Sequence, residues 1–248
     1  MMKKETLIRF IDKYNLGDLI PAVNWKVIAA DKVLKARGEL QQKTFAMDVT
    51  LKGFEEFTED VRVPVAATQK VKSMLAPFGE DITLTLNKNG DRVLGFNIAD
   101  QDCESYCSAA EPSAIPPVSK DLTDKHVYDV EISLTEEFVD KFLKARNALN
   151  EVEEFTIKMN KKDQVEFVLG FAVANTNRIS LVAPTRNGKD KFDGQPIRFL
   201  AKNFVEVLKA NKEMTDGVIY LKAGGVIKVV YSSDKFDCQY WQFAQVKK

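Results

Sequence analysis

Two cysteines, Cys103 and Cys107, lie four positions apart and are the first candidates for chemistry, because closely spaced cysteines can hold a zinc ion. A zinc site built on such a pair normally takes its other two ligands from a second cysteine or histidine pair, and the chain has only one histidine, His126, and no second cysteine pair beside the isolated Cys238. We therefore predict no metal site and interpret Cys103 and Cys107 as small apolar residues in or beside a strand. The odd, low cysteine count also argues against a disulfide framework.

Other motifs for catalysis are missing from the sequence. The segment Asn187-Gly188-Lys189-Asp190 resembles a nucleotide-base motif, but no GxxxxGK phosphate loop accompanies it. Gly224-Gly225 precedes an apolar run and is typical of a turn, and neither GxSxG nor HExxH occurs. His126 follows a proline-rich stretch, where we expect it to be solvated. We predict no catalytic residues, no cofactor and no enzymatic activity.

Four segments are predicted to be helices, because their apolar residues recur at helical spacing. These helices would position any functional side chains that they carry. The predicted helices span residues 3–14, 68–76, 135–147 and 200–212. The third begins with Thr135 followed by two glutamates, the cap and acidic first turn expected of a helix N-terminus.

Most of the remaining chain predicts short strands joined by tight turns, such as Asn89-Gly90. Hairpin connections favour an α+β fold with antiparallel sheets over alternating βαβ units. The polar segment 184–196 is expected to be an exposed loop. The predicted strands are residues 25–30, 45–51, 82–86, 92–98, 128–132, 155–159, 165–172, 179–182, 218–221, 226–231 and 238–243.

The chain repeats one order of elements. Residues 63–96 and 197–231 both predict a short strand, an amphipathic helix and two strands around a glycine turn. A proline-rich stretch, 111–117, separates them, and 248 residues with 45% hydrophobic content suffice for two packed domains. We predict an N-terminal domain 1–112, a connector 113–126 and a C-terminal domain 127–248. With no apolar run of about 18 residues and no signal-peptide pattern, we expect a cytoplasmic protein without a membrane partner.

Charge is unevenly distributed in a chain with 36 basic and 36 acidic residues. The four predicted helices hold twelve basic and six acidic residues, so the rest of the chain is net acidic. If the helices share one side, that side attracts phosphate. The alternative is that lysine is simply a good helix former on a solvated face, and the third helix, with three charges of each sign, fits the basic-face interpretation least.

Several segments resemble a known family. Phe96-Asn97-Ile98-Ala99-Asp100, Ala109-Ala110-Glu111-Pro112-Ser113, Lys191-Phe192-Asp193-Gly194 and Gln239-Tyr240-Trp241-Gln242-Phe243 are similar in order and spacing to stretches of the sliding clamps of T-even-type phages. These clamps are DNA polymerase processivity factors of the proliferating-cell-nuclear-antigen-like superfamily. Residues 24–62 match least.

The resemblance implies two pseudo-duplicated DNA-clamp domains, each with two helices packed on antiparallel sheets. Six such domains close a ring around duplex DNA, so two domains per chain imply a homotrimer. It also implies a DNA polymerase and a clamp loader as partners, and, if the chain is phage-encoded, an infected bacterial cell as its location. The side chains expected to face DNA are Arg9, Lys13, Lys70, Lys72, Lys141, Lys144, Lys202 and Lys209.

Clamps of this family bind a hydrophobic partner peptide near the connector and the C-terminal segment. The corresponding residues here are Ile115, Pro116, Val118, Tyr240, Trp241 and Phe243. The alternative is that these side chains alternate into a sheet core. Two other functions stay open from the sequence: a monomeric DNA-binding processivity factor that holds DNA on one basic face, and a structural or assembly module without a DNA role.

Overall fold

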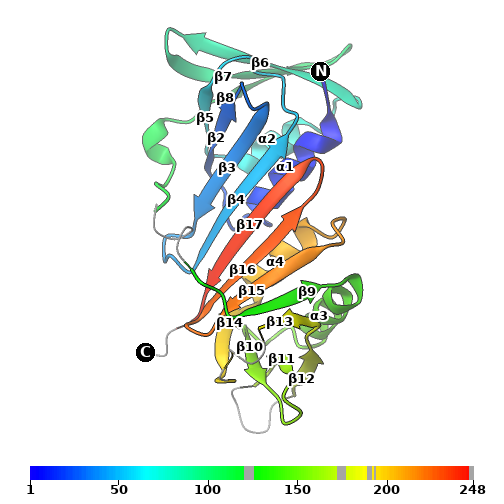
Figure 1. Cartoon of the computed structure of the whole chain (residues 1–248). Coiled ribbons are helices and arrows are strands. Elements are labelled where there is room, and N and C mark those ends of the chain that lie inside the picture. Colours follow the sequence, from blue (N-terminus) through cyan, green and yellow to red (C-terminus); the bar gives the residue numbers. More distant parts are fainter. Residues whose placement is uncertain (120–125, 172–176, 189–191, 193, 246–248) are drawn as a thin grey trace. The chain divides into compact units, whose positions relative to one another are not determined.

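The computed structural model forms two compact units (Figure 1). The first contains residues 1–41, 47–119 and 233–238, and the second contains residues 42–46, 120–232 and 239–248. The expected boundaries at 1–112, 113–126 and 127–248 stay a prediction, because part of the connector, 120–125, lies outside the described residues. The structure describes residues 1–119, 126–171, 177–188, 192 and 194–245.

Four α-helices lie in the described residues, each close to its predicted range. At the start of the third, the hydroxyl of Thr135 accepts a 3.2 Å hydrogen bond from the N–H of Phe138, and Glu136 and Glu137 occupy the first turn. This cap satisfies one of the free N–H groups of the first turn. The helices are α1 (Lys4–Asn15), α2 (Thr68–Met74), α3 (Glu136–Ala148) and α4 (Ala201–Ala210), and a short 3-10 helix spans Pro112–Ala114.

The strands pair antiparallel, so the predicted α+β class is confirmed. In the N-terminal half they are β1 (Met2–Lys3), β2 (Val23–Ile28), β3 (Val33–Glu39), β4 (Phe45–Lys52), β5 (Val61–Val65), β6 (Asp81–Asn89), β7 (Arg92–Ala99) and β8 (Glu104–Ser108). In the C-terminal half they are β9 (Val130–Leu134), β10 (Glu154–Met159), β11 (Val165–Leu169), β12 (Ile179–Val182), β13 (Thr185–Asn187), β14 (Ile197–Leu200), β15 (Gly217–Lys222), β16 (Val226–Ser232) and β17 (Phe236–Phe243).

The order of elements shows that the repeat predicted twice occurs four times. Each copy is a strand, a helix and three further strands. The copies are β1-α1-β2-β3-β4, β5-α2-β6-β7-β8, β9-α3-β10-β11-β12 and β14-α4-β15-β16-β17, with β13 as an addition between the third and the fourth.

Each repeat gives its first strand to the sheet of the other repeat in its half. β1 pairs with β6 through Met2 and Ile82, and β5 pairs with β2. In the same way, β9 pairs with β15 through Ile132 and Ile219, and β14 pairs with β10. Neither repeat of a pair therefore completes its own sheet, and each sheet contains strands from both repeats of its half.

Aromatic residues fill the core between helices and sheets in both units. In the first unit, α1 and α2 cover one face of the sheet of β2, β3 and β4 (Figure 1), and Phe10 of α1 packs edge-on against Tyr14 and Trp25. In the second unit, Phe142 of α3 lies 4.9 Å from Phe204 of α4, ring centre to ring centre, and 5.4 Å from Phe155 of β10. Such edge-to-face contacts stabilise the helix–sheet packing beyond area burial.

Two local predictions need correction. No strand was predicted over β3, yet Leu34, Ala36 and Gly38 alternate inward there, and two of these three residues are too small to give a clear apolar signal. The segment predicted as an exposed loop, 184–196, contains β13, which pairs with β9, and a buried Phe192.

Candidate nucleic-acid interface

Seven of the eight cations expected to face DNA keep exposed or partly exposed side chains on the helices. Arg9 lies on α1, Lys70 and Lys72 on α2, Lys141 and Lys144 on α3, and Lys202 and Lys209 on α4. Seven cations spread over four helices can attract a phosphate backbone without reading base sequence.

Lys13 differs from the prediction. Its side chain is 0% exposed, and its ammonium group lies 5.1 Å above the ring centre of Phe236. The sequence places Lys13 opposite the apolar stripe of α1, but the helix is covered on that side too. A cation held against an aromatic face and cut off from water cannot meet a phosphate, so Lys13 has a structural place here.

Some of the cations predicted to face DNA form ion pairs with neighbouring glutamates. Arg9 pairs with Glu5, Lys141 with Glu137 and Lys209 with Glu206, each pair within one helix. The hydrogen bond from Lys141 holds the pKa of the Glu137 carboxyl below its ordinary value. Within the described part of the chain, Lys70, Lys144 and Lys202 have no ion-pair partner. These three exposed ammonium groups are therefore the most available to a phosphate.

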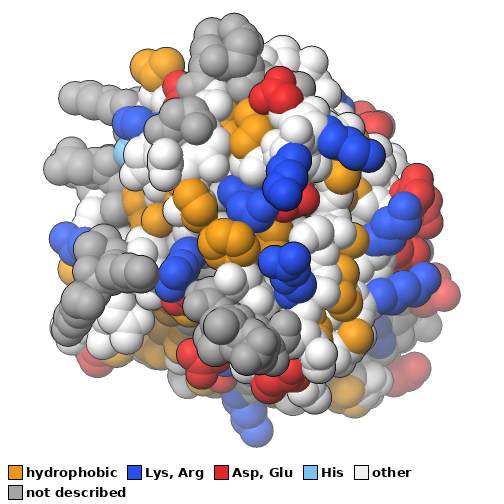
Figure 2. All heavy atoms as spheres, turned by 90° about the horizontal axis from the view of Figure 1, so that it is seen from below, with side chains coloured by type: hydrophobic (Ala, Val, Ile, Leu, Met, Phe, Trp, Pro, Cys, Tyr) orange, Lys and Arg blue, Asp and Glu red, His pale blue; other side chains and the backbone are white. Residues whose placement is uncertain are grey.

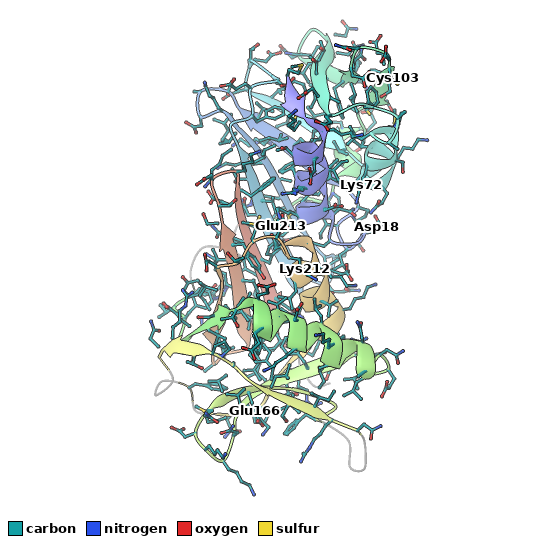
Figure 3. The ribbon with its side chains drawn as sticks, turned by 90° about the vertical axis from the view of Figure 1, so that its right-hand side faces the viewer. Asp18, Lys72, Cys103, Glu166, Lys212 and Glu213 are labelled. Carbon is teal, nitrogen blue, oxygen red and sulfur yellow. The ribbon has the colours of Figure 1, made fainter. Side chains whose placement is uncertain are left out.

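One ion pair also joins the two helices of each unit. Lys72 of α2 bonds to Asp12 of α1 at 2.5 Å, and Lys212, just beyond α4, lies 3.9 Å from Asp140 of α3 (Figure 3 labels both lysines). The pairs are half-exposed, so each contributes little to stability. Each unit thus has one weak ion pair between its two helical segments.

The residues expected to receive a partner peptide are mostly covered. Tyr240 is buried, accepts a 3.0 Å hydrogen bond from Asn211 and stacks on Phe45. Trp241 is buried beneath the ammonium group of Lys228. For these two, the structure agrees with the alternative that the aromatics belong to the sheet core. Ile115 is also buried, Pro116 is exposed, and Val118 and Phe243 are half-buried.

The remaining candidates carry no visible site. Cys107 is buried in β8 and Cys103 is half-buried just before it, which confirms the prediction that both lie in or beside a strand. Among the described residues, no group of three or more His, Cys, Asp or Glu side chains is arranged to hold a metal ion. None of the helices in the described ranges combines the length and apolar character that a transmembrane span requires.

A second cationic site was missed from the sequence. Lys161, Lys162 and Arg178 line an open groove of about 390 Å³ beside β10, β11 and β12. The turn that carries the two lysines is fixed by Asn160, whose side-chain oxygen accepts hydrogen bonds from the N–H groups of Lys162 and Gln164. The adjacent lysines were the only sequence signal, and a pair of charges in a turn is too common to indicate a site.

No protein-family model matches the sequence, and no curated protein sequence matches it. Among solved structures, proliferating cellular nuclear antigen (PCNA) from Entamoeba histolytica aligns with 98% of this chain and 96% of its own, with a TM-score of 0.72 and 13% identity. A. fulgidus PCNA, solved with the C-terminal region of FEN-1 bound, aligns over 100% and 98%, with a TM-score of 0.73 and 13% identity. The chain has the PCNA-like clamp fold. The clamp-domain architecture that the resemblance implied is thereby confirmed at the level of the backbone.

Proposed function

We propose that this protein is a sliding clamp: copies of the chain close into a ring around duplex DNA and tether a DNA polymerase for processive synthesis. The observation that carries the proposal is the PCNA-like fold over nearly the whole chain, combined with exposed cations on all four helices. The protein needs no enzymatic chemistry in this role, because the ring holds its partner on the template by topology.

The helix cations fit a tether that must slide. Lysine and arginine attract phosphates regardless of base sequence, and the attraction is weak enough to allow movement along the duplex. Ion pairs within the helices reduce the net attraction further, and Lys70, Lys144 and Lys202 are left to supply most of it. A clamp with tightly bound phosphates would stall, so partial neutralisation suits the function.

Three copies are the natural number for the ring. The clamp family that the sequence resembles closes its ring with six domains, and this chain has two units. Identical copies joined head to tail close only when the rotation per copy fits, so the proposal requires a rotation that closes after three copies. A separate ATP-driven clamp loader would open and place the ring.

Partner proteins are proposed by likeness to A. fulgidus PCNA, which is solved with the C-terminal region of FEN-1 bound. We propose that the DNA polymerase uses a similar short segment. The half-buried Val118 and Phe243 and the exposed Pro116 are its candidate contacts.

Retention on circular DNA tests the proposal. The protein is loaded on nicked circular DNA with a clamp loader, and release is measured before and after the circle is cut. A clamp stays on circles at raised salt and leaves when the DNA is linear. Equal release from both forms, or a strict monomer at high concentration, would show that the chain does not work as a ring. A monomeric factor held only by charge would leave both forms as salt increases.

A further inference from the structure

Three cations form a row across the sheet of the first unit. The register of the strands places Lys26 of β2 opposite Lys35 of β3 on one side and opposite Arg62 of β5 on the other. Neighbouring strands lie about 4.8 Å apart, so the row spans about 10 Å. These three residues are called the basic row below.

The basic row lies on the face of the sheet that α1 and α2 do not cover. Trp25 of β2 is buried and packs against Phe10 of α1, which places the helices on its side of the sheet (Figure 1). Lys26, the next residue, points to the opposite face, because side chains alternate along a strand. All three cations are exposed or partly exposed there, apart from the cations that the helices carry.

The carboxylates near the basic row bond to other groups. Glu39 of β3 accepts hydrogen bonds from the main-chain N–H (2.9 Å) and the hydroxyl (3.1 Å) of Ser119. Asp48 of β4 pairs with Arg37 at 3.2 Å, and Asp60 accepts a 2.8 Å hydrogen bond from the main-chain N–H that follows β2. Within the part of the chain that the structure describes, no member of the basic row has an ion-pair partner.

The second unit has an acidic residue in the equivalent row. Its strands β9, β15 and β16 correspond to β5, β2 and β3 in the order of elements. There, Tyr220 faces Glu131 on one side and Lys228 on the other. Like charges that face each other across strands destabilise a sheet, so the basic row lowers the stability of the first unit. A departure of this kind from stable design is expected at functional sites.

The cationic groove of the second unit differs from the basic row. Figure 2 shows the face seen from below, the side where β10, β11 and β12 lie in Figure 1, and acidic side chains lie among its lysine and arginine side chains. In the groove itself, Lys158 lies 2.5 Å from Glu166, which is labelled in Figure 3. The basic row has no such acidic member.

The residues around the basic row favour carboxylates as its ligands. Cations bind carboxylates and phosphates alike, but single-stranded nucleic acids also need aromatic side chains on which their bases stack. None of the described outward-facing residues next to the row on β2, β3 and β5 is aromatic; they are Asn24, Ile28, Val33, Arg37 and Pro64. An extended peptide covers about 10 Å with about four residues, so a short acidic run matches the length of the row.

We propose that the basic row binds an acidic segment of a partner protein, whose carboxylates supply the counter-charges that the sheet lacks. The surface lies outside the helices and the connector, so the inference goes beyond the proposed ring and does not depend on it. Because the row is exposed, the binding is strongest at low ionic strength and weakens as salt rises.

A labelled hexaglutamate peptide tests the proposal by fluorescence anisotropy with the full chain at low ionic strength. The natural chain should bind the peptide saturably. Lys26→Glu places an acid in the middle of the row and should weaken binding about tenfold or more. Lys235→Glu, at an exposed position in the turn between β16 and β17, makes the same change in net charge and is the matched control. It should weaken binding by less than about twofold.

Urea unfolding of the same variants gives a second readout. Lys26→Glu places a carboxylate opposite both Lys35 and Arg62, so it should raise the urea midpoint of unfolding, and Lys235→Glu should not. Weaker peptide binding by a more stable protein supports the basic row as a binding surface. If Lys26→Glu does not fold, Lys26→Gln takes its place, and natural binding by Lys26→Gln overturns the proposal.

Three further results would overturn the acidic ligand. The first is a natural chain that shows no saturable binding of hexaglutamate. The second is equal weakening in Lys26→Glu and Lys235→Glu, which would indicate attraction by net charge alone. The third is a larger loss of affinity in Lys26→Glu for a thymidine oligonucleotide than for the peptide, which would assign the row to nucleic acid. A chain that binds the peptide but stays monomeric overturns the ring and leaves this proposal intact.

Discussion

The indole N–H of Trp25 on β2 donates a 3.1 Å hydrogen bond to the hydroxyl of Tyr14 on α1, with both side chains fully buried. The Tyr14 hydroxyl in turn donates to the hydroxyl of Thr68 at the start of α2, at 3.4 Å. This chain of polar groups links two repeats inside the core of the first unit. Burial raises the pKa of the Tyr14 phenol well above its ordinary value, so the hydroxyl stays protonated as a donor.

Tyr14→Phe should therefore destabilise the protein by about 1–3 kcal/mol, because it leaves the buried Trp25 N–H without an acceptor. Urea unfolding followed by tryptophan fluorescence measures the loss. Tyr106→Phe is the matched control: its hydroxyl donates to the carbonyl of Leu94 at an exposed position, and its removal should cost less than about 1 kcal/mol. Equal losses in the two variants would contradict the buried linkage.

Substitutions at Lys13 and Lys202 should have different effects, the first on the free energy of unfolding and the second on DNA binding. Lys13→Ala removes a buried stem and its contact with Phe236, and should lower the free energy of unfolding by about 2 kcal/mol. Lys202→Ala should change stability by less than about 0.5 kcal/mol but reduce the salt dependence of DNA binding by about one phosphate contact. Urea unfolding and DNA binding over a salt series measure both effects. A Lys13→Ala protein of natural stability would argue against its structural place.

Acid should weaken the turn at Asp100. Hydrogen bonds from the N–H groups of Gly79, Asp102 and Cys103 hold the pKa of the Asp100 carboxyl below its ordinary value, with the bond from Gly79 as the largest cause. The charged form is favoured in the folded state, so its stabilisation is complete at neutral pH. It is lost as pH falls below about 4 through the folded-state pKa.

Asp100→Asn should therefore lower the Tm at neutral pH and flatten the decline of Tm in acid. Thermal unfolding monitored by circular dichroism over a pH series tests this expectation. Asp91→Asn, at an exposed position in the β6–β7 turn, serves as control and should keep the natural profile. A natural acid profile in Asp100→Asn would rule out the carboxylate as a contributor.

The cysteines of the β8 edge should differ in reactivity. Burial raises the pKa of the Cys107 thiol to about 11, which leaves about one thiolate in a thousand at pH 8. Cys103 is only half-buried, so iodoacetamide should modify Cys103 well before Cys107. Timed alkylation read by peptide mass spectrometry measures the order, and simultaneous modification would contradict it.

Periodicity was enough to predict the helices. Leu7, Ile11 and Tyr14 recur on one side of α1, and all three are buried as the spacing requires. The clamp fold, by contrast, depended on the resemblance of short segments, and the structure supports it over the whole chain. The spacing of apolar residues predicts which face of a helix or strand is buried, but it does not predict how the elements are connected into a fold.

The burial of Lys13 could not be predicted from the spacing of residues in α1. Its cover comes from Phe236, more than two hundred residues later in the chain, and no local pattern in α1 announces that contact. The strand at 33–39 was missed for a related reason, since Ala36 and Gly38 face inward but carry almost no apolar signal. In both cases, burial depends on contacts with residues that are far away in the sequence.

The exchange of first strands determines when these strands can pair during synthesis. Met2 and Lys3 find their partners only at Ile82 and Asp81, and Val130 pairs with Leu221, about ninety residues further on. While the ribosome makes the intervening chain, the opening strand of each pair of repeats has no sheet to join. The first strand of each half therefore stays unpaired until most of that half has been synthesised, and a chain truncated within a half would leave this strand without its partner.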